Sequence, residues 1–152
     1  MVNRLTNPLR ERPTPLGSLL NAAGQRLSAE LDAALHEAGF ADLRAAHAPV
    51  FMAIDPQGSR VTELAQRSAM SKQAVGDHVR YLTGHGYLTV TSDPDDRRAK
   101  TVALTERGWE ALDLGERVIA DYDTWLATAV GVDQVAALRE TLHRIIATPR
   151  RG

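Results

Sequence analysis

The sequence contains no cysteine in its 152 residues. This absence excludes disulfides, thiolate metal ligands, cysteine nucleophiles and the sensing of peroxide through a thiol. Also lacking are an apolar run long enough to cross a membrane and a charged N-terminal region followed by an apolar stretch. Neither sign of charge is in excess, because 18 Lys and Arg stand against 19 Asp and Glu. We therefore expect a cytoplasmic protein without membrane contact, and its overall charge does not point to a polyanionic partner.

The composition that remains is typical of a folded domain. Hydrophobic residues make up 43% and charged residues 24% of the chain, which is too apolar for a disordered protein. The length fits one domain with a sizeable core. Residues 1–15 include Pro8, Pro13 and Pro15, and we expect an extended arm there because proline lacks the N–H that a helix interior needs.

Long helices are predicted on both sides of the middle of the chain. Within residues 16–40, apolar residues recur at steps of three and four from Leu16 and predict a helix that ends at Gly39. Within residues 105–152, Thr105 is expected to cap a long helix, and a last helix follows Gly131. The residues expected to face inward from the long helix are Trp109, Leu112, Val118 or Ile119, Tyr122 and Leu126.

Residues 41–104 are more informative, beginning with three further helices. A helix is predicted over Ala41 to Ile54, ended by a Pro-Gln-Gly turn. A shorter helix is predicted over Thr62 to Ser68. Ser71 then has the position of an N-cap for a helix that runs to about Thr83, because its hydroxyl can accept a hydrogen bond from an unpaired backbone N–H.

The hydrophobic period changes after these helices. Residues 87–91 and 101–104 are rich in β-branched residues and alternate, so they predict two strands joined by the polar loop 92–100. The order of short helix, connection, helix and hairpin is that of a winged helix-turn-helix, whose second helix enters the major groove of DNA. Residues 59–108 hold 8 Lys and Arg against 6 Asp and Glu, so basic charge is modestly enriched in this part of an otherwise acidic chain.

The second helix of this motif has two distinct faces. Val75, Val79 and Leu82 are spaced to face a core. Gln can pair with adenine, and Lys or Arg can reach guanine or a phosphate. The residues expected at its N-terminus or on its outer face, as candidates for DNA contact, are Ser71, Lys72, Gln73, Asp77 and Arg80. Gly76 costs this helix about 1 kcal/mol against alanine, and Asp77 is unfavourable against DNA unless it accepts from a cytosine amino group.

Four segments together resemble the MarR family of bacterial transcriptional regulators. They are the strings VTELA from Val61, MSKQAV from Met70, GYL from Gly86 and DPDDRRAKTVALTERG from Asp93. The resemblance implies a mainly α fold with a small β-hairpin wing, in which residues 41–104 form the DNA-binding domain between long dimerisation helices. By the same resemblance, Arg98 enters the minor groove, Asp96 holds it in position, Arg97 meets a phosphate, and Lys100 lies in the same wing.

The resemblance also implies a two-fold dimer built from the terminal helices. Their apolar stripes exceed what one small core needs, and a two-fold dimer suits paired half-sites on DNA. The stripe residues expected at the interface are Leu16, Leu20, Leu27, Leu138, Leu142 and Ile145. We expect a homodimeric regulator, a repressor, that binds a pseudo-palindromic operator through helix 71–83 and wing 92–100. A winged-helix module that binds proteins without sequence-specific DNA binding is the alternative.

Family members bind small aromatic or anionic effectors, and here His47 and Phe51 are the candidate contacts, on one helix four residues apart. An enzyme is not expected, because the chain has no nucleophile elbow, glycine-rich phosphate loop or paired catalytic carboxylates. No cofactor is expected either. The five histidines are scattered and Asp93, Asp95 and Asp96 lack the glycine of a calcium loop, which argues against a metal site.

Overall fold

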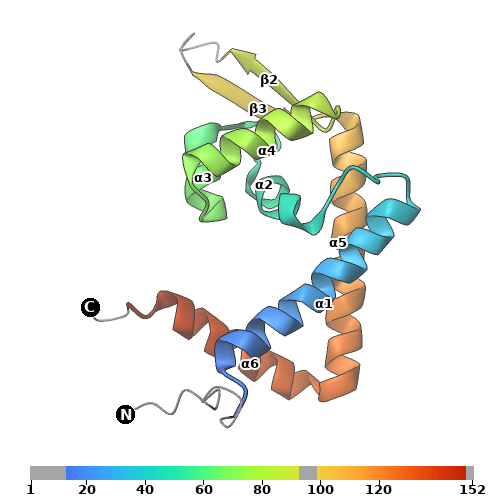
Figure 1. The fold of residues 1–152 in the computed structure, drawn as a ribbon, viewed down its shortest axis with the longest axis vertical. Coiled ribbons are helices and arrows are strands. Elements are labelled where there is room, and N and C mark those ends of the chain that lie inside the picture. The colour runs from blue at the N-terminus through green and yellow to red at the C-terminus, as the bar shows by residue number, and fades with distance from the viewer. Residues whose placement is uncertain (1–12, 93–98, 150–152) are drawn as a thin grey trace, which may run out of the picture.

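A computed structural model describes residues 13–92 and 99–149 of the chain (Figure 1). The elements in chain order are α1 (Leu16–Glu37), the 3-10 turn η1 (Ala45–His47), α2 (Ala48–Ala53), β1 (Ser59–Arg60), α3 (Val61–Ser68), α4 (Lys72–Gly84), β2 (Leu88–Ser92), β3 (Lys100–Leu104), α5 (Glu106–Val130) and α6 (Val132–Ala147). Elements η1 to β3 form one body, here called the head. Helices α1, α5 and α6 form an elongated stem that leads away from it.

The predicted helix caps are confirmed. Ser71 Oγ accepts a hydrogen bond from the Ala74 backbone N–H at 3.1 Å, and α4 begins at the next residue. Thr105 Oγ1 accepts from the Gly108 N–H at 3.1 Å, and α5 then runs for 25 residues. Each hydroxyl pairs one of the N–H groups that have no partner within the first helical turn.

The helix predicted over residues 41–54 is only partly confirmed, because residues 41–44 are not helical and residues 45–47 form a 3-10 turn. The structure has only η1 and the six-residue α2 there. Proline cannot donate a backbone hydrogen bond and is tolerated only in the first turn, so Pro49 places the start of α2 at Ala48. Before that point, a tertiary contact replaces helical hydrogen bonding, because Asp32 of α1 accepts from the Ala45 N–H at 2.6 Å.

The wing contains one strand that the sequence did not indicate. β1 pairs with β3 through Ser59 opposite Val102, and β2 pairs with the other edge of β3. The result is an antiparallel sheet of order β1-β3-β2. A strand of two residues is too short to show alternation, so only pairing with β3 defines it. With this addition the winged helix-turn-helix, mainly helical with a small sheet, is confirmed.

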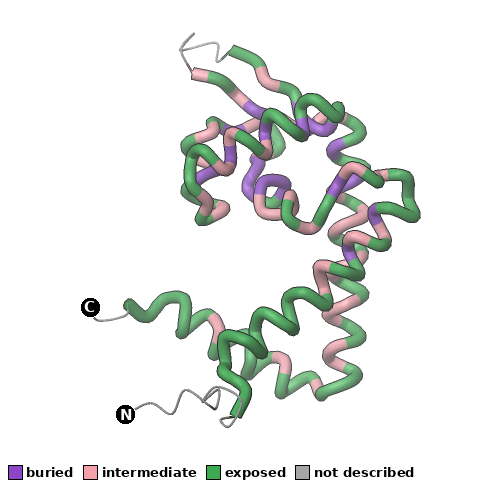
Figure 2. Tube along the Cα trace, viewed as in Figure 1, coloured by how far each residue is buried: buried purple, intermediate pink, exposed green. Residues whose placement is uncertain are grey.

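The core lies in the head and continues only a short way into the stem (Figure 2). The predicted core face of α4 is confirmed, with Val75 and Leu82 fully buried. In the stem, α5 has only Gly108 and Ala111 buried and α6 has no buried residue. Trp109 was expected to face inward but remains 38% exposed. Among the described residues, no helix has the length and apolarity to cross a membrane.

A joint centred on Tyr87 connects head and stem. Its buried phenol donates to the Asp42 carboxylate and accepts from the Arg107 guanidinium at 2.9 Å. Burial tends to raise the pKa of Asp42, but the hydrogen bond from Tyr87 and the charge of Arg107 outweigh it and the pKa lies below its ordinary value. The Tyr87 carbonyl also accepts from the Thr105 N–H at 3.1 Å. The turn after α1, the start of β2 and the start of α5 therefore meet at one side chain.

Gly108 allows α5 to approach this joint closely. A Cβ at residue 108 would lie 2.2 Å from the Tyr87 carbonyl oxygen, whereas a Cβ at Gly115 would lie 3.9 Å from its nearest neighbour. We expect Gly108→Ala to lower the free energy of unfolding by about 1–3 kcal/mol through overpacking. Gly115→Ala, one step of seven further along α5, should raise it by about 0.5–1 kcal/mol. Urea unfolding measures both, and equal effects would contradict the close approach.

Candidate nucleic-acid interface and ligand cavity

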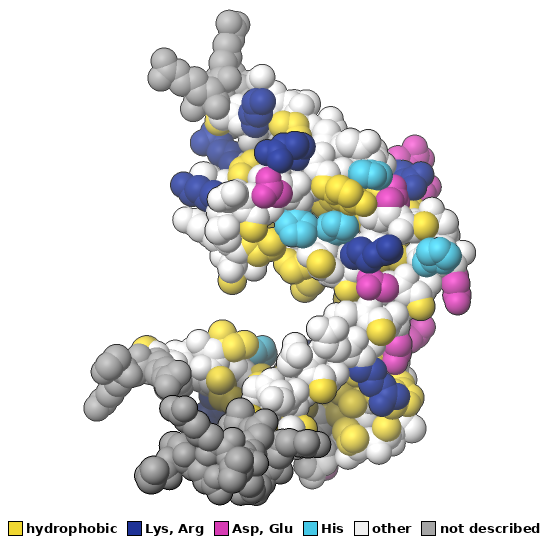
Figure 3. Space-filling model, in the orientation of Figure 1, with side chains coloured by type: hydrophobic (Ala, Val, Ile, Leu, Met, Phe, Trp, Pro, Cys, Tyr) yellow, Lys and Arg dark blue, Asp and Glu magenta, His cyan; other side chains and the backbone are white. Residues whose placement is uncertain are grey.

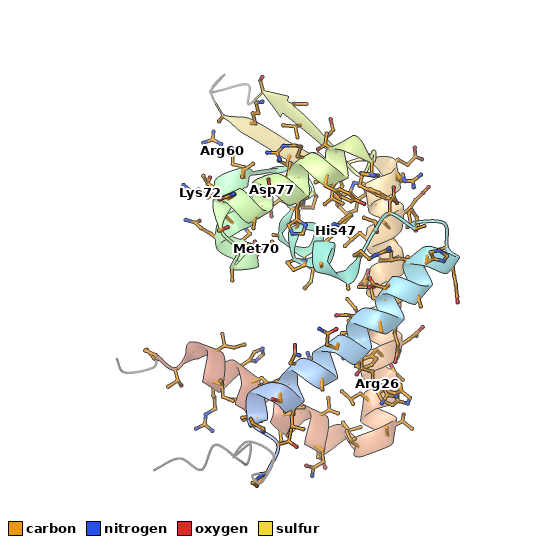
Figure 4. The ribbon with its side chains drawn as sticks, in the orientation of Figure 1. Arg26, His47, Arg60, Met70, Lys72 and Asp77 are labelled. Atoms are coloured by element: carbon orange, nitrogen blue, oxygen red, sulfur yellow. The ribbon has the colours of Figure 1, made fainter. Side chains whose placement is uncertain are left out.

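The outer face of α4 is polar and open to solvent. Its side chains point away from the buried residues Val75, Val79 and Leu82. Figure 4 labels Lys72 and Asp77 on this helix, and Figure 3 shows Lys and Arg side chains gathered on the end of the head that carries α3, α4 and the hairpin. The predicted contact residues that are exposed here are Ser71, Lys72, Gln73, Asp77 and Arg80.

The acid on this face has a basic partner on the same helix. Asp77 Oδ1 accepts from the Arg80 guanidinium at 2.9 Å, and both side chains are largely exposed. Such a surface pair contributes little to stability. The Arg80 charge does offset that of Asp77, the acidic residue that the sequence analysis found unfavourable against DNA.

The wing adds further basic groups beside α4. Lys100, at the start of β3, is exposed, while Asp96, Arg97 and Arg98 lie outside the described residues. The structure adds Arg60, which the sequence did not single out. Its exposed side chain lies on the same side of the head as Lys72 (Figure 4). No local pattern indicates this placement, because it depends on the pairing of β1 with β3.

A cavity of about 630 Å³ lies where head and stem meet. Its wall is formed by α1, the η1 and α2 segment, and α5, and it is mostly apolar. This volume is in the range of sites for small organic ligands. The lining includes Leu31, Leu35, Phe51, Trp109, Leu112 and Ile119. Trp109 thus remains partly exposed because it faces this cavity rather than the core.

Four charged or titratable side chains interrupt the apolar wall: Arg44, His47, Glu116 and Asp123. Asp123 is paired with Arg139 of α6 at 3.0 Å. The pKa of His47 is lowered, first by burial and then by the neighbouring charges of His78 and Arg44, so its ring is neutral at pH 7. The cavity therefore fits an apolar or aromatic molecule with one polar end.

Both candidate ligand residues line this cavity, but the reason given for them was wrong. His47 closes η1 and Phe51 belongs to α2, so they do not share one long helix. The residues that α1 and α5 contribute were missed. Only the crossing of two helices far apart in sequence makes them one wall. Within residues 13–92 and 99–149, no three His, Asp or Glu side chains gather as a metal site would require.

The head coincides with a known family. Residues 41–99 match the family model described as the MarR family. The winged-helix segment of this chain is therefore similar to the MarR family. The match covers η1, α2, β1, α3, α4 and β2 and ends just before β3, so it includes the helix whose outer face is described above. No curated protein matches the chain.

Solved structures resemble both the head and the stem of this chain. A mutant MarR from E. coli complexed with operator DNA is 22% identical, with a TM-score of 0.76 over 92% of this chain and 99% of that one. The transcriptional repressor CouR bound to a 23-mer DNA duplex is 24% identical, with a TM-score of 0.73 over 87% and 92%. CouR from Rhodococcus jostii RHA1 bound to p-coumaroyl-CoA is 23% identical, with a TM-score of 0.70 over 91% and 96%.

The cavity should accept an apolar aromatic probe, and Trp109 in its wall should report the binding. We expect titration with anilinonaphthalene sulfonate to change the fluorescence of Trp109. Ala120→Phe, which fills the cavity from an exposed position on α5, should weaken this binding about tenfold or more, since it occupies the same volume. Trp125→Phe is the matched control and should retain the signal. Equal probe binding by Ala120→Phe and the unmodified chain would place the probe elsewhere.

Proposed function

We propose that this chain is a homodimeric DNA-binding transcriptional regulator, a repressor that a small molecule releases from a pseudo-palindromic operator. The observation that carries the proposal is the outer face of α4. A polar, partly basic helix face stands opposite a buried apolar face, next to a hairpin, in a segment of the MarR family. This is the arrangement in which a recognition helix enters a major groove.

The roles proposed within the DNA interface follow from side-chain chemistry. Gln73 is suited to adenine and Arg80 to guanine or phosphate. The N–H groups of the first turn of α4, beside Ser71, are suited to a phosphate. Lys72 and Lys100 would neutralise phosphates, and the proposed roles in the wing remain Arg98 in the minor groove, Asp96 as its support and Arg97 on the backbone. Two of the similar structures contain DNA, which supports this assignment.

The stem supports a dimer because it leaves large apolar side chains open to solvent. Leu16 is 61%, Leu138 49% and Ile145 49% exposed, and Figure 3 shows the molecule hollowed between the head and the end of the stem. A surface of this kind requires a cover. A second copy of the same stem supplies one and sets two heads for half-sites about 34–36 Å apart. Leu20 is also exposed, and Leu27 and Leu142 are half-buried.

Effector control follows from the position of the cavity. Its wall contains residues of both stem and head, so a ligand that prefers one arrangement of the two shifts the population toward it. The change in the free energy of DNA binding cannot exceed the difference in ligand-binding free energy between the two arrangements. An effector that stabilises the wrong spacing of the two heads would act as an inducer. The similar CouR structure with p-coumaroyl-CoA supports a small-molecule ligand.

The test is selection of genomic fragments by the purified chain, followed by titration of the recovered site at about 50 and about 200 mM salt. We expect a two-fold motif and an affinity that falls steeply with salt, because bound phosphates release counterions. Gln73→Ala should reduce the preference for one base per half-site, while Gln57→Ala, an exposed glutamine outside α4, should not. Absence of enrichment at both salt concentrations would reject the regulator in favour of a protein-binding winged helix.

Dimerisation through the stem can be tested separately. We expect Leu142→Asp to give monomers by light scattering and to lose most operator affinity, since a charge would be placed in the apolar stripe of α6. Thr141→Asp adds the same charge one residue earlier and is the matched control. A normal dimer from Leu142→Asp would place the interface elsewhere.

A further inference from the structure

His47 makes ring contacts with the recognition helix proposed above. Its imidazole stacks on Tyr81 of α4, with centroids 5.1 Å apart and planes at 21°. It meets His78, one turn earlier on α4, edge to face at 5.2 Å. His47, labelled in Figure 4, is the last residue of η1, and its ring contacts α4. One side chain from η1 thus contacts two successive turns of α4.

The partners of His47 are themselves held in place. The Tyr81 hydroxyl donates to the Asp42 carbonyl at 2.8 Å, and His85 packs on the Tyr81 ring at 4.1 Å. His47 is fixed from its other side, because its Nδ1 accepts from the Arg44 backbone N–H at 3.1 Å. The contact between η1 and α4 is therefore a cluster of several ring contacts and hydrogen bonds rather than one isolated contact.

The same ring lines the cavity, alongside Phe51. A molecule in the cavity is therefore within reach of the same side chain that contacts α4. Arg44, three residues before His47 in the sequence, also lines the cavity. Glu116 and Asp123 line it from α5. The titratable and charged groups around His47 are completed by His78 and Tyr81 of α4, Asp32 of α1, and Asp42 before η1.

We propose that His47 is a positioning residue that seats α4 against η1 only while its ring is neutral, so that protonation and cavity occupancy act on the recognition helix through the same contact. This rests on the proposed function, since it concerns how that DNA-binding face is held. The acceptor role of Nδ1 is the basis, because a protonated imidazole has two N–H donors and no acceptor.

Protonation of His47 changes several interactions at once. Nδ1–H would face the Arg44 N–H, donor against donor, and the ring would carry a charge beside Arg44 and His78. Asp32 and Asp42 favour the charged ring, as does the face of Tyr81. The net result is a lowered pKa, to which burial contributes most. By linkage, stability is therefore highest above the ordinary histidine pKa and falls as the pH drops toward that of His47.

The sign of this effect on DNA binding is opposite to that of charge alone. Added positive charge near DNA strengthens binding at low salt. Loss of the contact between His47 and α4 weakens DNA binding, because the helix is no longer held in the orientation that the two half-sites require. A fall in operator affinity on acidification thus separates the positioning role from a general electrostatic one.

The experiment compares the unmodified chain with His47→Asn, whose Oδ1 takes the place of Nδ1 as acceptor and does not titrate. Operator affinity is measured at pH about 7.5 and about 5.5 at constant ionic strength. We expect a loss of about tenfold on acidification in the unmodified chain and a loss of less than about threefold in His47→Asn. His36→Asn, which removes an exposed histidine at the end of α1, should keep the full loss.

Equal pH dependence in His47→Asn and the unmodified chain, or an affinity that rises in acid, would overturn the proposal. If the chain binds no DNA at pH about 7.5, the proposed function fails. The positioning of α4 by His47 is then tested by NMR instead. In that measurement the amide signals of α4 around Tyr81 should shift with the same midpoint as the His47 ring. Signals of α4 that follow another midpoint, or none, would overturn the positioning role. The same measurement applies if His47→Asn does not fold.

Discussion

The arrangement of the whole molecule depends on the hydrogen bonds of one buried phenol. Tyr87 holds the Asp42 carboxylate on one side and the Arg107 guanidinium on the other, at the point where head and stem join. Removing this fully buried side chain would leave a cavity at the joint, whereas the partly exposed Asp42 and Arg107 would turn to water for their hydrogen bonds. Because its carbonyl also pairs with Thr105, the wing and α5 are oriented together. The direction in which α4 presents its outer face follows from this joint.

The proposed DNA-binding surface carries little net charge. The chain carries a net charge of -1, so attraction to phosphates must come from local placement rather than from the total. Lys72 and Lys100 are exposed on the head, and the Arg80 side chain offsets Asp77. A modest local excess suits a protein that distinguishes sites by base contacts, because phosphate contacts alone give affinity without sequence preference.

The cavity and α4, the proposed recognition helix, share one side chain. His47 belongs to the cavity wall and to the ring cluster on α4, and Asp42 connects that cluster to the Tyr87 joint through the Tyr81 hydroxyl. In the proposed mechanism, a ligand and a proton act on the same few contacts. Coupling of this kind needs no long pathway, because the two sites share side chains.

The sequence by itself determined the helices other than the one predicted over residues 41–54, the hairpin strands, the caps at Ser71 and Thr105, and the outer face of α4. These follow from periodicity and from hydrogen bonds between near neighbours. It also indicated the apolar stripes of the stem, although nothing in one chain states what covers them. Only the tertiary structure decided that residues 41–44 are not helical, that Ser59–Arg60 is a strand, and that Trp109 lines a cavity. In each case the partner is distant in sequence: Asp32 and Tyr87 for the turn, Val102 for the strand, and α1 for the cavity. Local patterns cannot encode such partners, because they are brought together only when the core has formed.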